Sequence, residues 1–530
     1  MPDAHAAPAA SGGSFAPLRQ PVFAVLWAAT VVGNVGSFMR DVASAWLVTD
    51  LAPGPMAVAL VQAAATLPVF LLAIPAGVLA DILDRRRFLI GIQLLLGGVS
   101  AALMVLSLAG AQSLATLIVL TFAGGVGAAL MGPVWQSIVP SLVPRSDLKD
   151  AVALNSLGVN VARSIGPAAG GLLLAGFGAA VTYGTNVLSY LFVVAALGWW
   201  RPAVEPERGV SERFFGAFRA GLRYARASRE LHRVLLRAAV FFSFASSTWA
   251  LLPLVARQML QGGAGYYGLL LGGVGAGAIA GAVLMPRLRR HLDADGQMLL
   301  ASLLAAGVLA VLAAAPPRPA ALALMLVLGL GWIVALTTLN GVAQSILPNW
   351  VRGRALAVYL TVFNGAMAAG SLAWGLVAHL IGVPAAMLVA AAGLSAAALL
   401  LHRARLPAGD SDLQPSRHWP EPLLALPVDP DRGPVLVLVD YRIRPDQIAP
   451  FLKALSRLSE ERRRNGACAW GVAEQTDAPG RLTEWFFVES WAEHLRHHER
   501  VSLADAALQR EVQRWHVGPQ PPAVRHLLAL

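Results

Sequence analysis

Ionisable side chains within long apolar runs are the first residues of this sequence that could do chemistry. Arg40 and Asp41 lie in the run 22–48, and Arg163 lies in the run 152–175. Charged groups are costly in hydrocarbon and usually line a wet cavity or a transport path. Asp41 could therefore take up and release a proton as its surroundings change. Arg163 could bind an anionic substrate or pair with a carboxylate.

Two other interpretations stay open at these positions. Arg40 and Asp41 could simply be exposed at the outer mouth of a membrane protein. Arg163 could serve as a structural partner for backbone carbonyls. Nearby Asn160 is a candidate for lining a substrate cavity. Other asparagines in apolar runs could line the same cavity or join helices: Asn34, Asn186, Asn340 and Asn364.

Two motifs could support a conformational change. Gly166-Pro167-Ala168-Ala169-Gly170-Gly171 lies inside one apolar run, where it would bend a helix and give it a thin face against which a neighbour could pivot. The same small residues could serve packing alone. The second motif closes another run: Gly77, Asp81, Asp84, Arg85 and Arg86.

Each residue type in the second motif has a physical use at a membrane edge. The glycine permits close helix approach, and an aspartate there can pair with basic groups or cap a helix. The arginines bind lipid phosphate and hold the loop inside. Together they could form a latch between states, although a plain topology-setting arginine cluster has the same composition.

The elements that carry these residues are membrane spans. The chain has 530 residues, is 56% hydrophobic and has only 13% charged residues, about half the charged share of a soluble domain. Roughly a dozen runs are long enough to cross a bilayer. Their approximate cores are 22–48, 56–80, 88–109, 113–139, 152–175, 180–200, 234–259, 266–286, 296–314, 319–345, 355–378 and 382–402.

Arginine falls in alternate loops, which follows the positive-inside rule and predicts that both termini are cytoplasmic. The net charge of +11 is therefore explained without a nucleic-acid partner. The loops between are nearly free of Lys and Arg, with Arg318 the exception. We expect a multi-pass protein of a bacterial cytoplasmic membrane, with the lipid bilayer as its solvent.

A repeated phrase indicates that the membrane part arose by duplication. Gln136-Ser-Ile-Val-Pro-Ser-Leu-Val143 has a second copy in Gln344-Ser-Ile-Leu-Pro-Asn-Trp-Val351, and arginines follow both copies, including Arg352 and Arg354. A glycine-to-arginine segment likewise recurs from Gly77 and from Gly281. Paired halves are typical of secondary transporters, which bind substrate between the halves.

We expect an all-α polytopic membrane protein of twelve transmembrane helices in two six-helix pseudo-repeats, followed by a small α+β ferredoxin-like domain. The central linker would hold an amphipathic helix from Phe214 to Ser228, lying on the inner leaflet or solvated. The expected parts are a disordered cytoplasmic N-terminus 1–20, a six-helix bundle 21–200, a basic cytoplasmic linker 201–233, a second bundle 234–403, a linker 404–433 and a cytoplasmic domain 434–530.

The last part shows a β-α-β-β-α-β order of strand and helix patterns. Docking or homodimer formation is its preferred role, and its strand order resembles the small dimeric α/β-barrel monooxygenases, so an enzymatic role for this domain stays open. His494, His497, His498 and Glu499 could form a metal cluster, with His494 and His498 on one helix face. The sequence positions no further ligand, so we expect neither a metal nor a cofactor. Cys468, the only cysteine, excludes an intrachain disulfide.

The segment from Gly77 to Arg87 resembles the signature between spans 2 and 3 of the major facilitator superfamily. The segment ending in Gly170-Gly171 is similar to the antiporter signature of its drug exporters, although Ala162 replaces the glycine four residues before Gly166. The blocks around Gln344 and Ala153-Leu-Asn-Ser156 narrow the resemblance, over about residues 18–405, to the enterobactin-exporter-like branch, also called transmembrane secretion effectors.

This resemblance implies proton-driven export of a siderophore, drug or other bulky metabolite, without selecting among them. Uniport or import is the alternative, as is a transporter fused to a monooxygenase-like domain. A non-transporting membrane scaffold for that domain is disfavoured by the duplicated signatures and the buried charges. The sequence has no Gly-x-x-x-x-Gly-Lys-Ser/Thr phosphate loop, so ATP would not drive transport through this chain alone.

Overall fold

The computed structural model describes residues 15–52, 54–201, 214–409, 412–414, 416 and 428–529. These residues form two compact units. The first unit consists of 1–207, 237–339 and 360–405, and the second of 208–236, 340–359 and 406–530. The second unit therefore combines the C-terminal domain with the central linker and the 340–359 connection. The expected disorder of residues 1–20 falls mostly outside the described residues.

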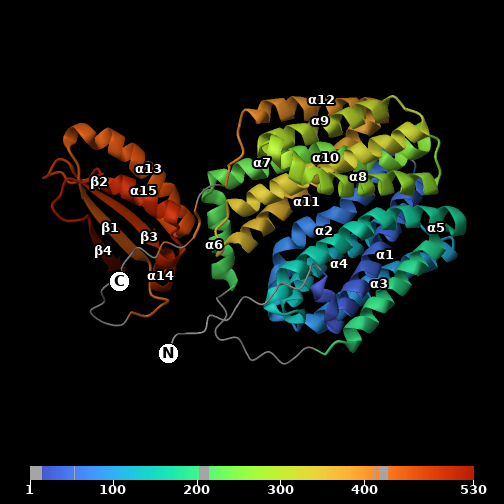
Figure 1. Cartoon of the computed structure of the whole chain (residues 1–530), viewed down its shortest axis with the longest axis horizontal. Helices are drawn as coiled ribbons and strands as arrows, with labels where there is room; N and C mark the ends of the chain where they lie inside the picture. Colours follow the sequence, from blue (N-terminus) through green and yellow to red (C-terminus); the bar gives the residue numbers. More distant parts are fainter. Residues whose placement is uncertain are drawn as a thin grey trace, which may run out of the picture. The chain divides into compact units, whose positions relative to one another are not determined.

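The first bundle is drawn in blue to green in Figure 1. It begins with a short 3₁₀ turn, η1 (Ala16–Arg19), and contains a second one, η2 (Arg145–Asp147). Its helices are α1 (Pro21–Leu51), α2 (Pro55–Ile82), α3 (Arg85–Leu108), α4 (Leu114–Leu142) and α5 (Leu148–Trp199). Asp84 and Ser113 cap α3 and α4 by accepting bonds from backbone N–H groups.

α5 contains two of the expected spans. It has 52 residues, and the helical backbone is interrupted at Gly178, where φ is 82°. Only glycine adopts this conformation at little cost, so the chain turns there between the runs 152–175 and 180–200. Eleven helices of the described chain are long and apolar enough to cross a membrane. Because α5 supplies two spans, they account for the twelve expected from the sequence.

The second bundle runs from green to orange in Figure 1. Its helices are α7 (Arg229–Leu254), α8 (Ala264–His291), α9 (Ala294–Ala313), α10 (Arg318–Ser345), α11 (Arg352–Ile381) and α12 (Val383–His402). A π-helical turn, η3 (Val255–Met259), continues α7. The linker forms α6 (Phe214–Ala227), where the sequence indicates a helix. Whether α6 lies on a lipid surface remains a prediction.

The repeated phrases fall on equivalent helices of the two bundles. The first copy ends α4, the fourth helix of its half, and the second ends α10, the fourth helix of the other half. In both copies the serine hydroxyl donates to the carbonyl three residues earlier, from Ser137 to Val134 and from Ser345 to Val342. Gly77 and Gly281 likewise lie on the second helices, α2 and α8. The pseudo-repeat predicted from the sequence is confirmed.

The C-terminal domain contains one four-stranded antiparallel sheet, of order β2-β3-β1-β4. Its strands are β1 (Val435–Arg442), β2 (Ala467–Glu474), β3 (Arg481–Val488) and β4 (Ala523–Leu528). Its helices are η4 (Pro445–Gln447), α13 (Ile448–Asn465), α14 (Trp491–Arg500) and α15 (Leu503–Gln513). The chain order matches the predicted β-α-β-β-α-β order, except that two helices, α14 and α15, stand where one was expected.

The alternation of buried and half-buried residues along β1 explains which face of the sheet the helices cover. Val435, Val437 and Val439 are buried, while the residues between them are only half-buried. The buried set packs against Phe451 and Leu455 of α13 in one core. One face of the sheet is therefore covered by helices, as its two-residue period requires.

Candidate functional site

Arg40 and Asp41 form one side of a cavity in the first bundle. Arg40 is buried and donates from Nε and Nη2 to Oδ1 of Asp41, at 3.1 and 2.8 Å. Its Nη1 lies 3.4 Å from the hydroxyl of Tyr190. The Asp41 side chain is 52% exposed. The structure therefore fixes the guanidinium and leaves the carboxylate accessible.

The cavity has a volume of about 320 Å³ and lies among α1, α3, α4 and the second half of α5. Its polar lining includes Asn34, Ser37, Gln93 and Tyr190, besides Arg40 and Asp41. The Ser37 and Tyr190 hydroxyls are 2.9 Å apart. A carboxylate held beside a fixed cation, in a cavity with amide and hydroxyl groups, can exchange a proton or bind a polar solute. Tyr190 was missed because a lone tyrosine in an apolar run carries no sequence signal.

Arg163 and Asn160 do not line this cavity. Asn160 donates to the carbonyl of Ser156 on its own helix, at 2.9 Å. Arg163 is half-buried in α5. Its guanidinium forms no hydrogen bond or ion pair with another described residue. The structure thus brings together Arg40 and Asp41 but leaves Arg163 and Asn160 apart from them. Asn186 joins two helices, because its amide on α5 donates to the hydroxyl of Ser100 on α3 at 2.9 Å.

The glycine motif of α5 packs against two helices at once. A Cβ at Gly166 would lie 2.6 Å from Cβ of Phe38, and one at Gly170 would lie 2.7 Å from Cα of Met39, so α1 approaches closely on this side. A Cβ at Gly171 would lie 2.7 Å from Cα of Gly268 on α8. Since α8 belongs to the other bundle, the motif makes a close contact between the two halves.

A second inter-bundle contact forms at the end where α1 meets α2, which we call the α1–α2 end. A Cβ at Gly375 of α11 would lie 2.2 Å from Cβ of Ala59 on α2. Arg257 of η3 forms an ion pair with Asp50, near the end of α1, and donates to Thr49 at 2.8 Å. The guanidinium also lies 5.7 Å from the ring centre of Trp46. The bundles are therefore joined at this end by small residues and one ion pair.

The motif that follows α2 contacts the ends of neighbouring helices. Arg86 donates to the carbonyls of Leu197 and Gly198 at 2.8 and 2.7 Å, at the end of α5. Arg85 donates to Ser137 at 3.4 Å. Cations at helix C-termini satisfy free carbonyls and oppose the helix dipole. Gly77 has open space around it, and the side chain of Asp81 lies outside the described residues.

The second copy of the repeated phrase has a different arrangement. Arg352 donates from Nε and Nη2 to the carbonyl of Leu347, at 3.3 and 3.2 Å. Arg354 lies beside α6, since a Cβ at Gly221 would lie 2.7 Å from Cβ of Arg354. These two arginines therefore fix the 340–359 connection within the second unit.

A buried ion pair lies in the second bundle. Arg237 lies within α7 and is only 6% exposed. It pairs with Asp295 at 2.6 Å and donates to the carbonyl of Ala404 at 3.0 Å. Burial of a charge requires such partners. The pair joins α7, α9 and the end of α12.

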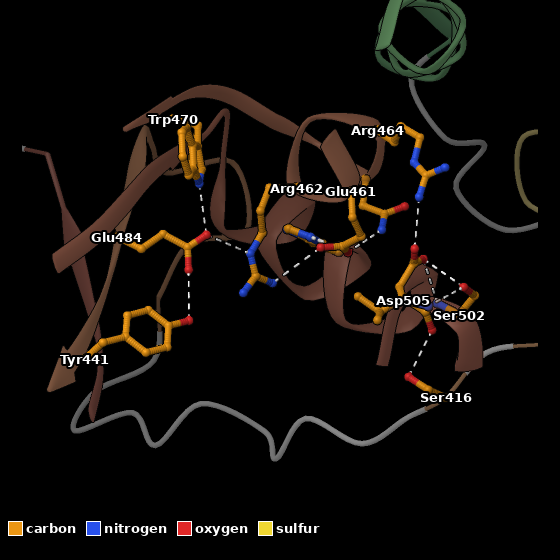
Figure 2. Close-up of polar contacts among 12 residues, drawn as sticks. Ser416, Tyr441, Glu461, Arg462, Arg464, Trp470, Glu484, Ser502 and Asp505 are labelled. Atoms are coloured by element: carbon orange, nitrogen blue, oxygen red, sulfur yellow. Dashed lines mark hydrogen bonds and ion pairs between the residues drawn. The ribbon is translucent and has the colours of Figure 1, made fainter. Parts of the chain in front are cut away.

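The C-terminal domain contains a buried charged network, shown in Figure 2. The two oxygens of Glu484 accept from Trp470 at 2.9 Å, from Arg462 at 3.3 Å and from Tyr441 at 3.2 Å. Burial and the Glu484 charge raise the pKa of Tyr441 well above its usual value. The buried charges in this network are neutralised by oppositely charged or hydrogen-bonding neighbours within it. Such an arrangement suits a structural role in the domain core.

Glu461 extends the network toward α14. Burial alone would raise its pKa, but the nearby His497 and the charge of Arg462 lower it to about 2. The amide of Asn465 donates to it at 2.6 Å. On the same helix face as expected, His494 and His498 lie with their ring centres 4.7 Å apart. Burial lowers the pKa of His494 to about 2, so this ring is neutral at physiological pH.

Within the second unit, α14 also contacts the linker helix. Arg223 of α6 pairs with Glu493 at 3.1 Å and with Glu489 at 3.2 Å. Arg500 lies 4.2 Å above the ring of Trp350, a residue of the repeated phrase. These contacts were not predictable, because their residues lie far apart in the sequence.

Comparison with known proteins gives the family. A family model described as transmembrane secretion effector matches residues 12–530. The chain is similar to the multidrug efflux pump Tap of Mycolicibacterium fortuitum, with 28% identity over 70% of this chain and 92% of the pump. It is 23% identical to the staphyloferrin A transporter of Staphylococcus aureus, over 51% of this chain and 68% of that protein.

Two further matches agree with this assignment. The enterobactin exporter EntS of Salmonella choleraesuis is 29% identical over 50% of this chain and 62% of the exporter. A solved bacterial homologue of the iron transporter ferroportin, in an inward-facing state, has the same fold, with a TM-score of 0.59 and 16% identity over 72% of this chain and 98% of the homologue. The two-bundle fold, its repeated signatures and the match along nearly the whole chain lead to one conclusion: this chain is a multi-pass membrane protein of the transmembrane secretion effector family, within the major facilitator superfamily.

Proposed function

We propose that this protein exports a small molecule across a bacterial cytoplasmic membrane by alternating access, driven by proton entry. The observation that carries the proposal is the set of close inter-bundle contacts at the α1–α2 end, through Gly171–Gly268, Gly375–Ala59 and Arg257–Asp50. Such closure is one of the two states that alternating access requires. With the arginine-rich loops inside, the closed α1–α2 end faces out, and both termini face the cytoplasm.

The relatives indicate which substrates to test. Their names identify siderophore exporters and transporters and multidrug efflux pumps. We therefore propose a bulky small molecule with polar groups, such as a siderophore, a macrolide or a lipophilic cation. The cavity beside Asp41 and Arg40 would hold a polar part of such a solute, although most of its binding surface would form between the bundles.

Asp41 is our candidate for proton coupling. Its carboxylate is accessible, while Arg40 holds one oxygen in place from a buried position. Protonation from outside would weaken its attraction to Arg40, and release inside would restore it. Arg163, with Asn160 nearby on the same helix, is a second candidate for contact with an anionic substrate.

The test uses everted membrane vesicles in which a pH-sensitive dye reports the proton gradient. Siderophores, macrolides and lipophilic cations are added singly to the wild-type protein, to Asp41→Asn and to Asp150→Asn. Asp150 is a matched control, because it is a half-buried carboxylate in the first turn of α5 and outside the cavity. We expect one compound to collapse the gradient with the wild-type and control proteins but not with Asp41→Asn.

Each other result has a defined meaning. Undiminished collapse with Asp41→Asn would overturn the role of Asp41 and leave proton antiport in place. Substrate flux that ignores the gradient would replace antiport with uniport. Flux only into the cytoplasm would replace export with import.

A further inference from the structure

Three histidines from two separate elements meet in the C-terminal domain. His494 and His498 lie one turn apart on α14, and His526 lies on β4. The ring centres of His494 and His526 are 4.6 Å apart, close to the 4.7 Å that separates His494 from His498. One ring nitrogen from each residue lies within 4.8 Å of the others.

His494 is the unusual member of this group. It is only 1% exposed, yet neither of its ring nitrogens has a hydrogen-bond partner among the described residues. A buried imidazole normally donates from one nitrogen and accepts at the other, because unpaired polar atoms in a core are costly. Its neighbours are the rings of Trp491, His498 and His526. The unpaired nitrogens therefore point to a missing partner.

We propose that His494, His498 and His526 bind a divalent transition-metal ion of borderline softness, with Zn²⁺ as the reference ion. Neutral imidazole suits Zn²⁺, Co²⁺, Ni²⁺ and Cu²⁺. Tetrahedral zinc places its nitrogen ligands at about 2.0–2.1 Å, which corresponds to a separation of roughly 3.4 Å between them. The three nitrogens need only small side-chain rotations to reach this separation, and the fourth position would hold water.

The surrounding structure holds the ligands in place. Ser490 caps α14 by accepting from the N–H of Glu493, so the helix start that precedes His494 is fixed. β4 pairs with β1, which sets His526 opposite Val437. His497 takes no part, since it faces Glu461 at 3.8 Å on another side of α14. The charge of Arg462 is balanced by Glu484 and Glu461, so it opposes a bound cation only weakly.

This site is independent of the transport proposal, because all three ligands belong to the C-terminal domain. It also explains the histidine-rich segment that the sequence could not complete. The sequence placed two of the ligands on one helix face. The third lies 28 residues beyond His498, on a strand that only the folded sheet brings near.

The test measures metal binding to the purified full-length protein in detergent. The protein carries a tag without histidine and is stripped with a chelator. Zn²⁺ is then titrated in competition with a chromophoric indicator. We expect one ion per chain, and binding weakened by at least about tenfold in His526→Ala, since even outer partners of metal ligands contribute that much. His291→Ala is the matched control, because His291 is an exposed histidine at the end of α8.

Two further measurements keep the result interpretable. His498→Ala, at a half-buried position, repeats the test if the first variant folds poorly, and circular dichroism confirms folding of both. Loading with Co²⁺ should give the visible absorption of a tetrahedral site, which the histidine variants should lose. Wild-type protein that binds no stoichiometric ion, or variants that bind as tightly as the wild type, would overturn the proposal.

Discussion

Arg257, on the π-helical turn η3, forms an ion pair with Asp50, the penultimate residue of α1. The pair joins the two six-helix bundles at the end where Gly375 meets Ala59. Both side chains are partly exposed, at 37% and 45%. Such a pair stabilises a closed state weakly, which suits a contact that would break in each cycle of the proposed alternating access.

Arg257→Gln should increase the population of the state that is open at the α1–α2 end. Because the pair is partly exposed, its loss should cost about 1 kcal/mol or less, so this population should rise at most about fivefold. A maleimide-accessible cysteine at Ala59, in a Cys468→Ser background, measures the opening. Ala59 is fully buried against Gly375 in the closed state.

Arg318→Gln is the control for this measurement. Arg318 donates to the carbonyl of Leu260 at 3.0 Å, so its contact stays within the second bundle. Its loss should leave the labelling rate unchanged. The charge-reversed pair Asp50→Arg with Arg257→Asp should restore slow labelling. Equal labelling of all variants would contradict a role of this ion pair in closing the α1–α2 end.

Gly171→Val should prevent closure of the same end. Its Cβ would lie 2.7 Å from Cα of Gly268 and 2.8 Å from the carbonyl oxygen of Ala264, and backbone atoms cannot move aside. Overpacking costs typically about 1–3 kcal/mol, which predicts roughly 5- to 150-fold more of the open state. Labelling at Ala59 should accelerate and export should fall. Gly176→Val, with open space around it, should change neither.

Arg223→Ala should loosen the linker helix within the second unit. Arg223 is 22% exposed and pairs with the buried Glu493, which keeps its bonds to Arg496 and Arg500. We expect a cost of about 1 kcal/mol and about fivefold faster hydrogen exchange at the α6 amides 221–227. Arg226→Ala, at an exposed position of the same helix, should leave exchange unchanged. Unaltered exchange in Arg223→Ala would mean that the ion pair does not hold α6.

The C-terminal domain should lose stability in acid through Glu461. In the unfolded chain its carboxyl binds a proton below about pH 4.5, whereas in the folded domain it stays ionised to about pH 2. The unfolded state therefore binds more protons between these values, so stability rises with pH there. The contribution, on the order of 3 kcal/mol, is fully present above about pH 4.5 and is lost as the pH falls toward 2.

Hydrogen exchange of the α13 amides in the full-length protein measures this stability between pH 2.5 and 5. Glu461→Gln should flatten the dependence on pH, because the amide does not titrate. Glu511→Gln, at a partly exposed surface pair with Arg457, should preserve it. An unchanged slope in Glu461→Gln would show that another group governs the acid response.

Much of the architecture could be predicted because its signals are local. Span length follows from runs of apolar residues, and the domain boundary near 434 is proposed from the change to a two-residue period at Val435–Val439. The repeated phrase located equivalent helices, and the glycine motif of α5 identified a close-packing face. The small residues alone could not indicate which neighbours they meet, since Gly171 and Gly268 are almost a hundred residues apart.

Only the tertiary structure decided which partners the charged and titratable groups have. Arg257 and Asp50 are separated by 207 residues. Arg237 and Asp295 lie on different helices, and only the packing of α7 against α9 brings them together. His526 joined His494 and His498 only through the pairing of β4 with β1. The reason is physical: hydrophobic period and length depend on adjacent residues, whereas an ion pair or metal site depends on atoms that distant segments bring within a few ångströms.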